Sequence, residues 1–460
     1  MEAWLQAHRA ELLEDLRRCI QIPSVYQEDD SGYPFGLPVH RCLTFMLDLA
    51  RQKGLAVHNM DNYLGWCEYG QGEELVAVLA HLDVVPSGTG WTEDPFGGQI
   101  RDGRIYGRGA VDDKGPAMAA LYALLALKES QVPLKRRVRL IFGLDEESGS
   151  RDMRYYRNNG GELPMLGFAP DGEYPVINGE KGLVNETYRC SWSQTGPLRL
   201  TLLEGGQAHN IVPGEARAVL CCPPEQVRRI LAMQGEKIRC SPLPDGVEVR
   251  AEGVSAHGGI PEEGENAIGR LMGFLAGLPL DPAAAGPVEL LAEKFGLEYD
   301  GRSLGIARAD APSGALTMNL GVLRGDERGM EIQLNYRYPV TSSFEACGPV
   351  VQETLESVGF RRVSGVHKPA LYLPEDHPLV TSLLEVYRQQ TGQPGRAKCI
   401  GGGTYAKMLP NILAFGPLFP GDEVREHKPD EFMEVERLLD NARMFAAAML
   451  RLAGTRQEEE

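Results

Sequence analysis

A histidine and an aspartate directly follow an apolar segment early in the chain. Residues 75–80 read Leu-Val-Ala-Val-Leu-Ala, and His81-Leu82-Asp83 come next. A continuous apolar run of this length is typical of a strand buried on both faces. Alternate residues of an extended chain point the same way, so His81 and Asp83 should lie together where the strand ends. His81 could bind a metal ion while Asp83 orients its neighbour, although a surface pair at a strand end would be the commoner explanation of this motif alone.

Two adjacent carboxylates, Asp112 and Asp113, precede a predicted helix. They follow Gly107-Arg108-Gly109-Ala110-Val111 and are followed by Lys114-Gly115, and the Ala- and Leu-rich residues 115–129 predict the helix. An aspartate before a helix often caps its free amides. A cap explains one aspartate better than two, so the sharper interpretation is a carboxylate that bridges two cations.

Three consecutive carboxylates, Asp145-Glu146-Glu147, follow a second apolar segment at 138–142. Adjacent negative charges repel one another unless water or cations neutralise them. One glutamate could bind a metal ion while the adjacent one acts as general base on the attacking water. An acidic surface loop is the alternative for this motif on its own.

Two further candidates are weaker individually. Asp171 lies in a Pro-Asp-Gly turn, where aspartate is common for structural reasons, and His427 lies in a charged loop. With the three motifs above, they complete a set of histidines and carboxylates of the kind that binds paired divalent ions. Two ions roughly 3.5–4 Å apart would share one carboxylate and activate a water. Imidazole and carboxylate ligands suit Zn²⁺, with Mn²⁺ and Co²⁺ as alternatives.

The predicted elements divide the chain into an α/β part and an α+β part. Helices over 3–20 and 37–54, then strand, helix and strand over 75–80, 115–129 and 138–142, predict an α/β layer. Short strands separated by glycine and proline turns predict an α+β region, at 198–203, 217–222, 247–251 and 330–336. A helix near 375–390, a strand over 411–415 and a helix over 431–452 complete the chain. We therefore predict an α/β catalytic domain with a mixed, mostly parallel sheet and flanking helices, in two parts (1–179 and 369–460) that are interrupted by an inserted α+β lid domain (180–368).

The bulk properties disfavour several classes of protein. The 460 residues carry a formal net charge of −17, which argues against nucleic acid and membranes as partners. The apolar runs are shorter than the ~20 residues of a membrane span. The first residues lack a signal-peptide pattern, which predicts a cytoplasmic location. The nine cysteines are scattered without a CxxC pair, which argues against a disulfide framework or a cysteine-rich zinc site.

Taken in order, the motifs are similar to those of a known family. They are His81-Leu82-Asp83, Gly107-Arg108-Gly109 through Asp112-Asp113-Lys114-Gly115, Asp145-Glu146-Glu147, Pro170-Asp171 and His427. The chain resembles the co-catalytic, di-zinc metallopeptidases that include carnosinases, aminoacylases and carboxypeptidase G. Within them it is most similar to the bacterial PepV-type dipeptidases, and the resemblance runs over nearly the whole chain.

The resemblance implies a ligand set for two metal ions. His81 and Asp171 would hold one ion, Glu147 and His427 would hold the other, and Asp112 would bridge the two. Zn²⁺ is the expected metal, with Mn²⁺ or Co²⁺ as alternatives.

The resemblance also implies roles for the neighbours of these ligands. Asp83 would orient His81. Glu146 would be the general base that takes a proton from the attacking water and passes it to the leaving amine. The Asp112–Asp113 peptide bond is expected to be cis.

A substrate-binding set in the later part of the chain is implied by the same resemblance. His257 would stabilise the oxyanion of the tetrahedral intermediate. Arg337 carries a guanidinium group suited to a substrate carboxylate. The other members are Asn210 and the loop residues Gly402, Gly403 and Thr404, whose backbone amides could contact that carboxylate.

The long insertion bears on assembly and on substrate length. Residues 180–368 are long enough to carry two lid halves in one chain, which implies a monomer that supplies His257 itself. A lid that closes over the site would exclude water and limit the length of the substrate. His209 departs from the family pattern, in which a small residue or threonine is more usual.

We therefore predict a two-metal-dependent dipeptidase that hydrolyses dipeptides or short peptides with a free C-terminal carboxylate. Two alternatives stay open. An N-acyl amino-acid deacylase or desuccinylase would use the same catalytic set. A non-catalytic binding protein could share the fold, although the presence of all the ligand and base residues argues against it.

Overall fold

The computed structural model of the protein describes residues 1–454, so residues 455–460 of the predicted C-terminal part lie outside it. The chain forms two compact units. Unit 1 contains Met1–Asn178, Leu373–Lys398 and the described residues from Thr404 onward, and unit 2 contains Gly179–Tyr372 and Cys399–Gly403. Within the described residues, no helix combines the length and apolar character that crossing a membrane requires.

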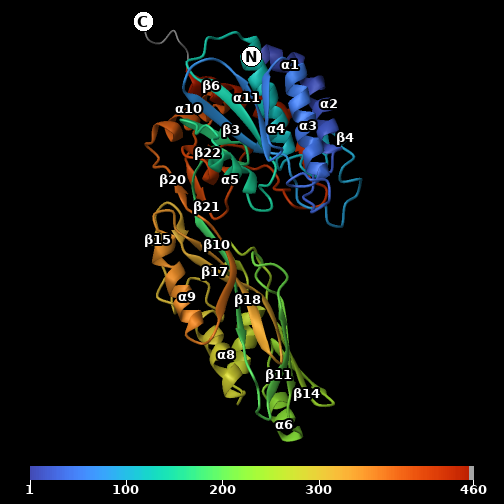
Figure 1. Ribbon diagram of the computed structural model, residues 1–460, viewed down its shortest axis with the longest axis vertical. Coiled ribbons are helices and arrows are strands. Elements are labelled where there is room, and N and C mark those ends of the chain that lie inside the picture. Colours follow the sequence, from blue (N-terminus) through green and yellow to red (C-terminus); the bar gives the residue numbers. More distant parts are fainter. Residues whose placement is uncertain (455–460) are drawn as a thin grey trace. The chain divides into compact units, whose positions relative to one another are not determined.

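The centre of unit 1 is a mixed sheet whose strands follow the order β1-β2-β6-β3-β7-β22-β9. Figure 1 labels β6, β3 and β22 of this sheet. The middle strands run parallel to one another: β6 (Arg137–Gly143), β3 (Leu75–His81), β7 (Leu166–Ala169) and β22 (Ile412–Ala414). The flanking strands are antiparallel: β1 (Ala56–Met60), β2 (Leu64–Tyr69) and β9 (Ile177–Glu180). All residues of β3 are buried, as its continuous apolar sequence predicts.

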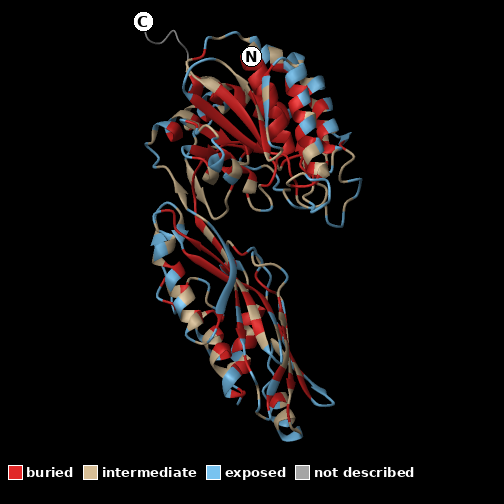
Figure 2. Cartoon of the chain, viewed as in Figure 1, coloured by how far each residue is buried: buried red, intermediate tan, exposed pale blue. Residues whose placement is uncertain are grey.

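Helices cover this sheet and hold its strands in place. α4 (Lys114–Glu129) and α11 (Val435–Ala453) pack against each other and against β3 and β6. α4 is buried along almost its whole length, which suits a helix that is apolar on all sides. Figure 2 shows the buried strands of unit 1 and the exposed outer faces of its helices. The other helices of the unit are α1 (Glu2–Ala7), α2 (Arg9–Ile20), α3 (Leu37–Gln52), α5 (Arg151–Asn158) and α10 (Pro378–Thr391).

Two helices differ from the sequence prediction. The helix predicted over 3–20 is interrupted at His8, whose ring stacks on Trp4 with centroids 3.9 Å apart. The helix predicted over 431–452 begins only at Val435, because Phe432–Glu434 form β24, which pairs with β5 (Arg104–Tyr106). This pairing places the segment that follows His427 beside the segment that leads to Asp112.

Unit 2 is built on an antiparallel sheet with its own hydrophobic core. The strand order is β13-β14-β12-β11-β17-β18-β10-β19. α7 (Ala267–Ala276) packs on the sheet, and α8 (Pro282–Lys294) packs on α7. The strands are β10 (Gly182–Ser191), β11 (Arg199–Gly205), β12 (Glu215–Cys221), β13 (Ile238–Leu243), β14 (Gly246–Glu252), β17 (Thr317–Asp326), β18 (Gly329–Tyr338) and β19 (Arg361–Lys368). The predicted fold class, a mixed α/β catalytic part and an α+β insertion, is confirmed.

The smaller elements complete the two units. Helices α6 (Pro224–Ala232) and α9 (Gly348–Glu356) belong to unit 2. The short strands not yet named are β4 (Gln99–Arg101), β8 (Gly172–Glu173), β15 (Ala309–Asp310), β16 (Gly314–Ala315), β20 (Leu371–Tyr372), β21 (Lys398–Ile400) and β23 (Pro417–Leu418).

Candidate metal centre

The parallel strands of unit 1 bring three of the sequence motifs to one edge of the sheet. His81 is the last residue of β3. Glu147 follows β6, which ends at Gly143, and Asp171 follows β7, which ends at Ala169. Because parallel strands end at the same edge, their carboxyl ends gather these side chains, as is usual for sites in α/β sheets.

His81 is buried, and its two ring nitrogens face different groups. Nε2 lies 2.9 Å from Asp112 Oδ1 and 3.9 Å from Asp171 Oδ2. Nδ1 lies 3.0 Å from the carbonyl oxygen of Asp83 and 3.4 Å from its Oδ1. The contacts of Nδ1 with Asp83 hold the ring so that Nε2 faces the two other carboxylates.

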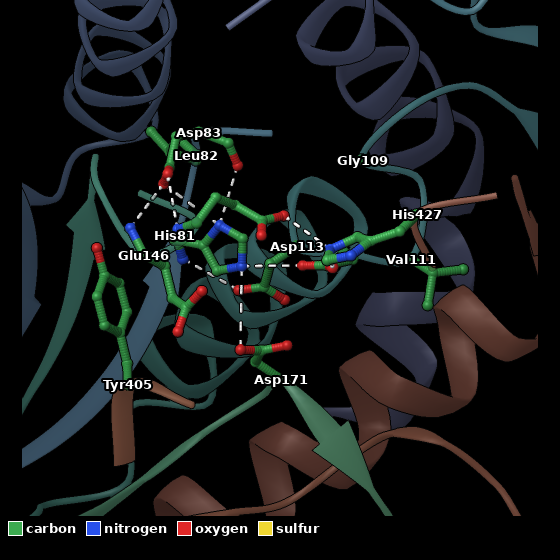
Figure 3. Close-up of polar contacts among 12 residues, drawn as sticks. His81, Leu82, Asp83, Gly109, Val111, Asp113, Glu146, Asp171, Tyr405 and His427 are labelled. Atoms are coloured by element: carbon green, nitrogen blue, oxygen red, sulfur yellow. Dashed lines mark hydrogen bonds and ion pairs between the residues drawn. The ribbon is translucent and has the colours of Figure 1, made fainter. Parts of the chain in front are cut away.

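Asp112 contacts a histidine with each of its carboxylate oxygens. Its Oδ2 lies 3.0 Å from Nε2 of His427, and that nitrogen lies 3.1 Å from Glu147 Oε1. Figure 3 shows His81, Asp171 and His427 directed toward one another. The Asp112–Asp113 peptide bond is cis, as the resemblance implied.

These residues form two groups of potential metal ligands that share one member. His81, Asp112 and Asp171 form the first group, and Asp112, Glu147 and His427 form the second. Within each group the ligand atoms lie within 4.8 Å of one another. Within residues 1–454, no lysine or arginine forms an ion pair with any of the three carboxylates. The donor chemistry and the excess negative charge therefore fit a pair of divalent cations.

The charges inside the cluster perturb its pKa values strongly. Hydrogen bonds to Asp112 and Glu147 raise the pKa of His427 to about 11. Burial opposes protonation of His81, but Asp112 and Asp83 outweigh it and raise the pKa of His81 well above its usual range. Burial and the charge of Asp112 raise the pKa of Glu147 to about 7 and that of Asp171 well above its usual range. Binding of divalent cations would require both histidines to be neutral and the carboxylates to be ionised, because metal ligands must be deprotonated.

Asp83 also fixes the loop that carries the two glutamates. Its Oδ1 accepts a hydrogen bond from the Glu146 amide at 3.2 Å, and its Oδ2 accepts one from the Glu147 amide at 3.1 Å. Figure 3 shows the Glu146 side chain beside His81 and Asp171. One aspartate therefore orients a candidate ligand and positions the candidate base.

The candidate substrate residues of unit 2 gather around Arg337, which lies on β18. Arg337 is 4% exposed, and burial lowers its pKa to about 10. Its Nη1 donates to the Gly401 carbonyl at 2.9 Å, and it forms no ion pair within residues 1–454. A Cβ at Gly259 would lie 2.3 Å from Arg337 Nη1 and 3.0 Å from His257 Cε1, so these two side chains approach the same glycine. A buried guanidinium without a carboxylate partner in the described chain suits an anionic ligand.

The segments that carry Asn210 and His257 pair with each other. The Gly258 amide donates to the Asn210 carbonyl at 2.7 Å, and Ile211 and His257 form an isolated β-bridge. Both Asn210 and His257 are exposed. His209 lies in the same segment, and burial and the charge of Arg337 lower its pKa.

The glycine-rich loop lies between β21 and a 3-10 helix. Gly402 and Gly403 belong to unit 2 with Gly401, whose carbonyl accepts from Arg337. Thr404 belongs to unit 1, and its Oγ1 accepts from the Ala406 amide at 3.1 Å, which caps the helix Tyr405–Met408. The Thr404 side chain therefore has a structural partner.

Two buried acids beside the site were not assigned from the sequence. The Asp152 carboxylate accepts hydrogen bonds from the Leu144 amide at 2.6 Å, from the Asp145 amide at 3.1 Å and from the Tyr405 hydroxyl. Glu431 contacts the loop that precedes Asp112. Glu431 binds backbone amides of a segment far away in the chain, whereas Asp152 binds amides seven and eight residues before it. No spacing pattern in the sequence marks such contacts.

A comparison with known protein families identifies the family of the chain. Residues 77–451 match the peptidase family M20/M25/M40. The chain belongs to this family. The predicted membership of the metallopeptidase family is thereby confirmed, and the protein is a hydrolase of the peptidase class.

Similar proteins cover almost the whole chain. A protein of Bacillus subtilis (strain 168), named "Putative dipeptidase YtjP", is 38% identical over 458 residues, which cover 97% of this chain and 98% of that protein. The solved aminoacylhistidine dipeptidase from Vibrio alginolyticus has a TM-score of 0.61 at 14% identity, with 97% of each chain covered. The solved dipeptidase Dug1p from Saccharomyces cerevisiae has a TM-score of 0.60 at 15% identity, with 100% of this chain and 98% of that chain covered. At these low identities, the two solved structures support the fold alone.

Proposed function

We propose that the protein is a dipeptidase that depends on two divalent metal ions and acts on peptides with a free C-terminal carboxylate. The observation that carries the proposal is that Asp112 belongs to both candidate ligand groups. The family and the name of the similar Bacillus subtilis protein support dipeptides as the substrate class.

The ligand assignment follows the two groups. His81 and Asp171 would hold one ion, Glu147 and His427 the other, and Asp112 would be shared. Zn²⁺ is the metal that best suits imidazole and carboxylate ligands, with Mn²⁺ and Co²⁺ as alternatives. When bound, such ions polarise the substrate carbonyl and lower the pKa of the attacking water.

The residues around the ligands would handle protons and orientation. Glu146 would take a proton from the attacking water and deliver it to the leaving amine. The amide of Glu146 is held by Asp83, which also contacts Nδ1 of His81, so base and ligand share one support. This arrangement keeps the base in a fixed position relative to the ligands.

Unit 2 would supply substrate recognition. Arg337 would bind the C-terminal carboxylate of the peptide, with Asn210 and the amides of Gly402, Gly403 and Thr404 as further contacts. His257 would stabilise the oxyanion of the tetrahedral intermediate. We propose that residues 180–368 act as a lid and substrate-binding domain. The monomeric state, the cytoplasmic location and the absence of nucleic-acid or membrane partners stay predictions.

A substrate panel tests the proposal. Metal-free protein would be assayed before and after addition of Zn²⁺ or Mn²⁺ on several L,L-dipeptides, β-Ala-His, a tripeptide, an N-acetyl and an N-succinyl amino acid. We expect metal-dependent cleavage of dipeptides and no cleavage of the acylated compounds. Cleavage of the acylated compounds alone would assign the protein to the deacylases. Binding of metal without cleavage of any compound would favour a non-catalytic role.

A further inference from the structure

Glu431 places its carboxylate inside the turn that leads to Asp112. Its Oε1 accepts hydrogen bonds from the amides of Gly109 at 3.1 Å, Val111 at 2.8 Å and Asp112 at 3.2 Å. Its Oε2 accepts from Arg108 Nη1 at 2.6 Å. The side chain is fully buried, so these groups take the place of water around the charge.

The same residue connects the segments that carry two candidate ligands. Glu431 follows His427 in the loop before β24, and its backbone carbonyl accepts a hydrogen bond from the Gly107 amide at 2.9 Å. Its backbone and its side chain therefore both bind the segment that ends at Asp112. Asp112 and His427 belong to one ligand group, so Glu431 links the supports of both.

The residue that follows Asp112 is anchored as well. Oδ2 of Asp113 accepts a hydrogen bond from the His81 amide at 3.0 Å. The backbone of Asp112 is thus anchored by Glu431 before it and by Asp113 after it. These two anchors leave the Asp112 carboxylate between His81 and His427.

The ion pair with Arg108 completes the surroundings of Glu431. Arg108 is 1% exposed, and its Nη2 donates to the Ser87 carbonyl at 3.3 Å. Its guanidinium carbon lies 5.3 Å from the centroid of the Trp91 ring. A buried ion pair contributes little net stability because desolvation offsets the attraction. The three hydrogen bonds that Glu431 accepts from backbone amides instead fix the position of the turn that leads to Asp112.

We propose that Glu431 is a positioning residue of the metal centre, which holds Asp112 opposite His427 so that the shared carboxylate is in place when the ions bind. This inference rests on the proposed two-metal function. Loss of a group that orients metal ligands typically weakens metal binding by about 10–100-fold.

The test is a Zn²⁺ affinity measurement on metal-free protein without substrate, by competition with a chromophoric chelator. We expect Glu431→Gln to weaken Zn²⁺ binding by about 10–100-fold relative to the unsubstituted protein. The matched control is Asp430→Asn, because the Asp430 carboxylate accepts hydrogen bonds from the amide and hydroxyl of Thr92, at 2.8 and 2.7 Å, and none from the turn before Asp112. We expect the control to bind Zn²⁺ with unchanged affinity.

Three outcomes would overturn the inference. Unchanged Zn²⁺ affinity of Glu431→Gln would remove the positioning role. An equal loss in Asp430→Asn would indicate general loosening of the segment. If Glu431→Gln does not fold because Arg108 is left unpaired, the double variant Glu431→Gln/Arg108→Met removes both charges, and normal Zn²⁺ affinity of that variant would equally contradict the inference. Failure of the unsubstituted protein to bind Zn²⁺ would instead contradict the proposed function itself.

Discussion

The carboxylate of Asp112 lies 3.0 Å from Nε2 of His427, although the two residues come from segments far apart in the chain. The contact is made possible by the pairing of β24 with β5, which aligns the segments on either side. Because the other oxygen of Asp112 contacts His81, one side chain serves both candidate ligand groups. Two metal ions that share a ligand should therefore bind as a pair.

The adjacent glutamates of the 145–147 motif should respond differently to substitution. We expect Glu146→Gln to keep both metal ions and to lower kcat by about 10²–10⁴-fold, because a general base is lost. We expect Glu147→Gln to lower the metal content, because its carboxylate is one of three donors in its group. Metal content per chain and dipeptide turnover would be measured on the same samples. Full activity of Glu146→Gln would rule out its assignment as the base.

Arg337 should determine the requirement for a free C-terminal carboxylate. A charge-assisted hydrogen bond contributes roughly 1.5–3 kcal/mol, so we expect Arg337→Gln to lower kcat/KM for a dipeptide by about 10–100-fold. The same dipeptide with an amidated C-terminus is the matched control, and the variant and the unsubstituted protein should cleave it equally poorly. An equal loss of kcat/KM on both substrates would show that Arg337 does not bind the C-terminal carboxylate.

Asp152 should make stability depend on pH. Burial raises the pKa of this carboxyl from 3.8 to about 7. The folded protein therefore binds a proton that the unfolded chain releases between about pH 4 and pH 7, and the free energy of unfolding should fall as pH rises through that window. At about 1.4 kcal/mol per pKa unit, the change is of the order of a few kcal/mol.

The isosteric variant Asp152→Asn isolates this effect. It keeps an oxygen acceptor for the amides of Leu144 and Asp145 but cannot titrate. Urea unfolding midpoints of metal-free protein would be compared from pH 4 to pH 8. The midpoint of the unsubstituted protein should fall relative to that of the variant up to about pH 7 and then stay level. Parallel pH curves would contradict the raised pKa.

The buried parts of the fold could be predicted because burial leaves a pattern in the sequence. β3 and α4 are apolar along almost their whole length, and the sequence predicts both within one or two residues of their observed bounds. β19 was not predicted, because almost all of its residues are exposed and its place in the sheet depends on pairing with β10. The sequence predicts β24 as part of a helix, because only its pairing with β5 defines it as a strand.

Three members of the ligand groups could be predicted from local patterns, because His81 and Glu147 follow predicted strands and Asp112 precedes a predicted helix. Asp171 and His427 lie in loops, and the resemblance to a known family supplied their assignment. The supporting groups could not be predicted in this way. Glu431 and Asp152 bind backbone amides. Because such contacts do not depend on the side chain of the partner, the residue types in the sequence do not reveal them. The sequence alone therefore does not distinguish these buried acids from exposed ones.

Titration of metal-free protein with Zn²⁺, while hydrolysis of an L,L-dipeptide is followed, tests the central claim most directly. The shared position of Asp112 predicts that activity is absent without metal and rises until two equivalents per chain have been added. Activity that survives complete removal of metal, or that reaches its maximum at one equivalent, would contradict a two-metal dipeptidase.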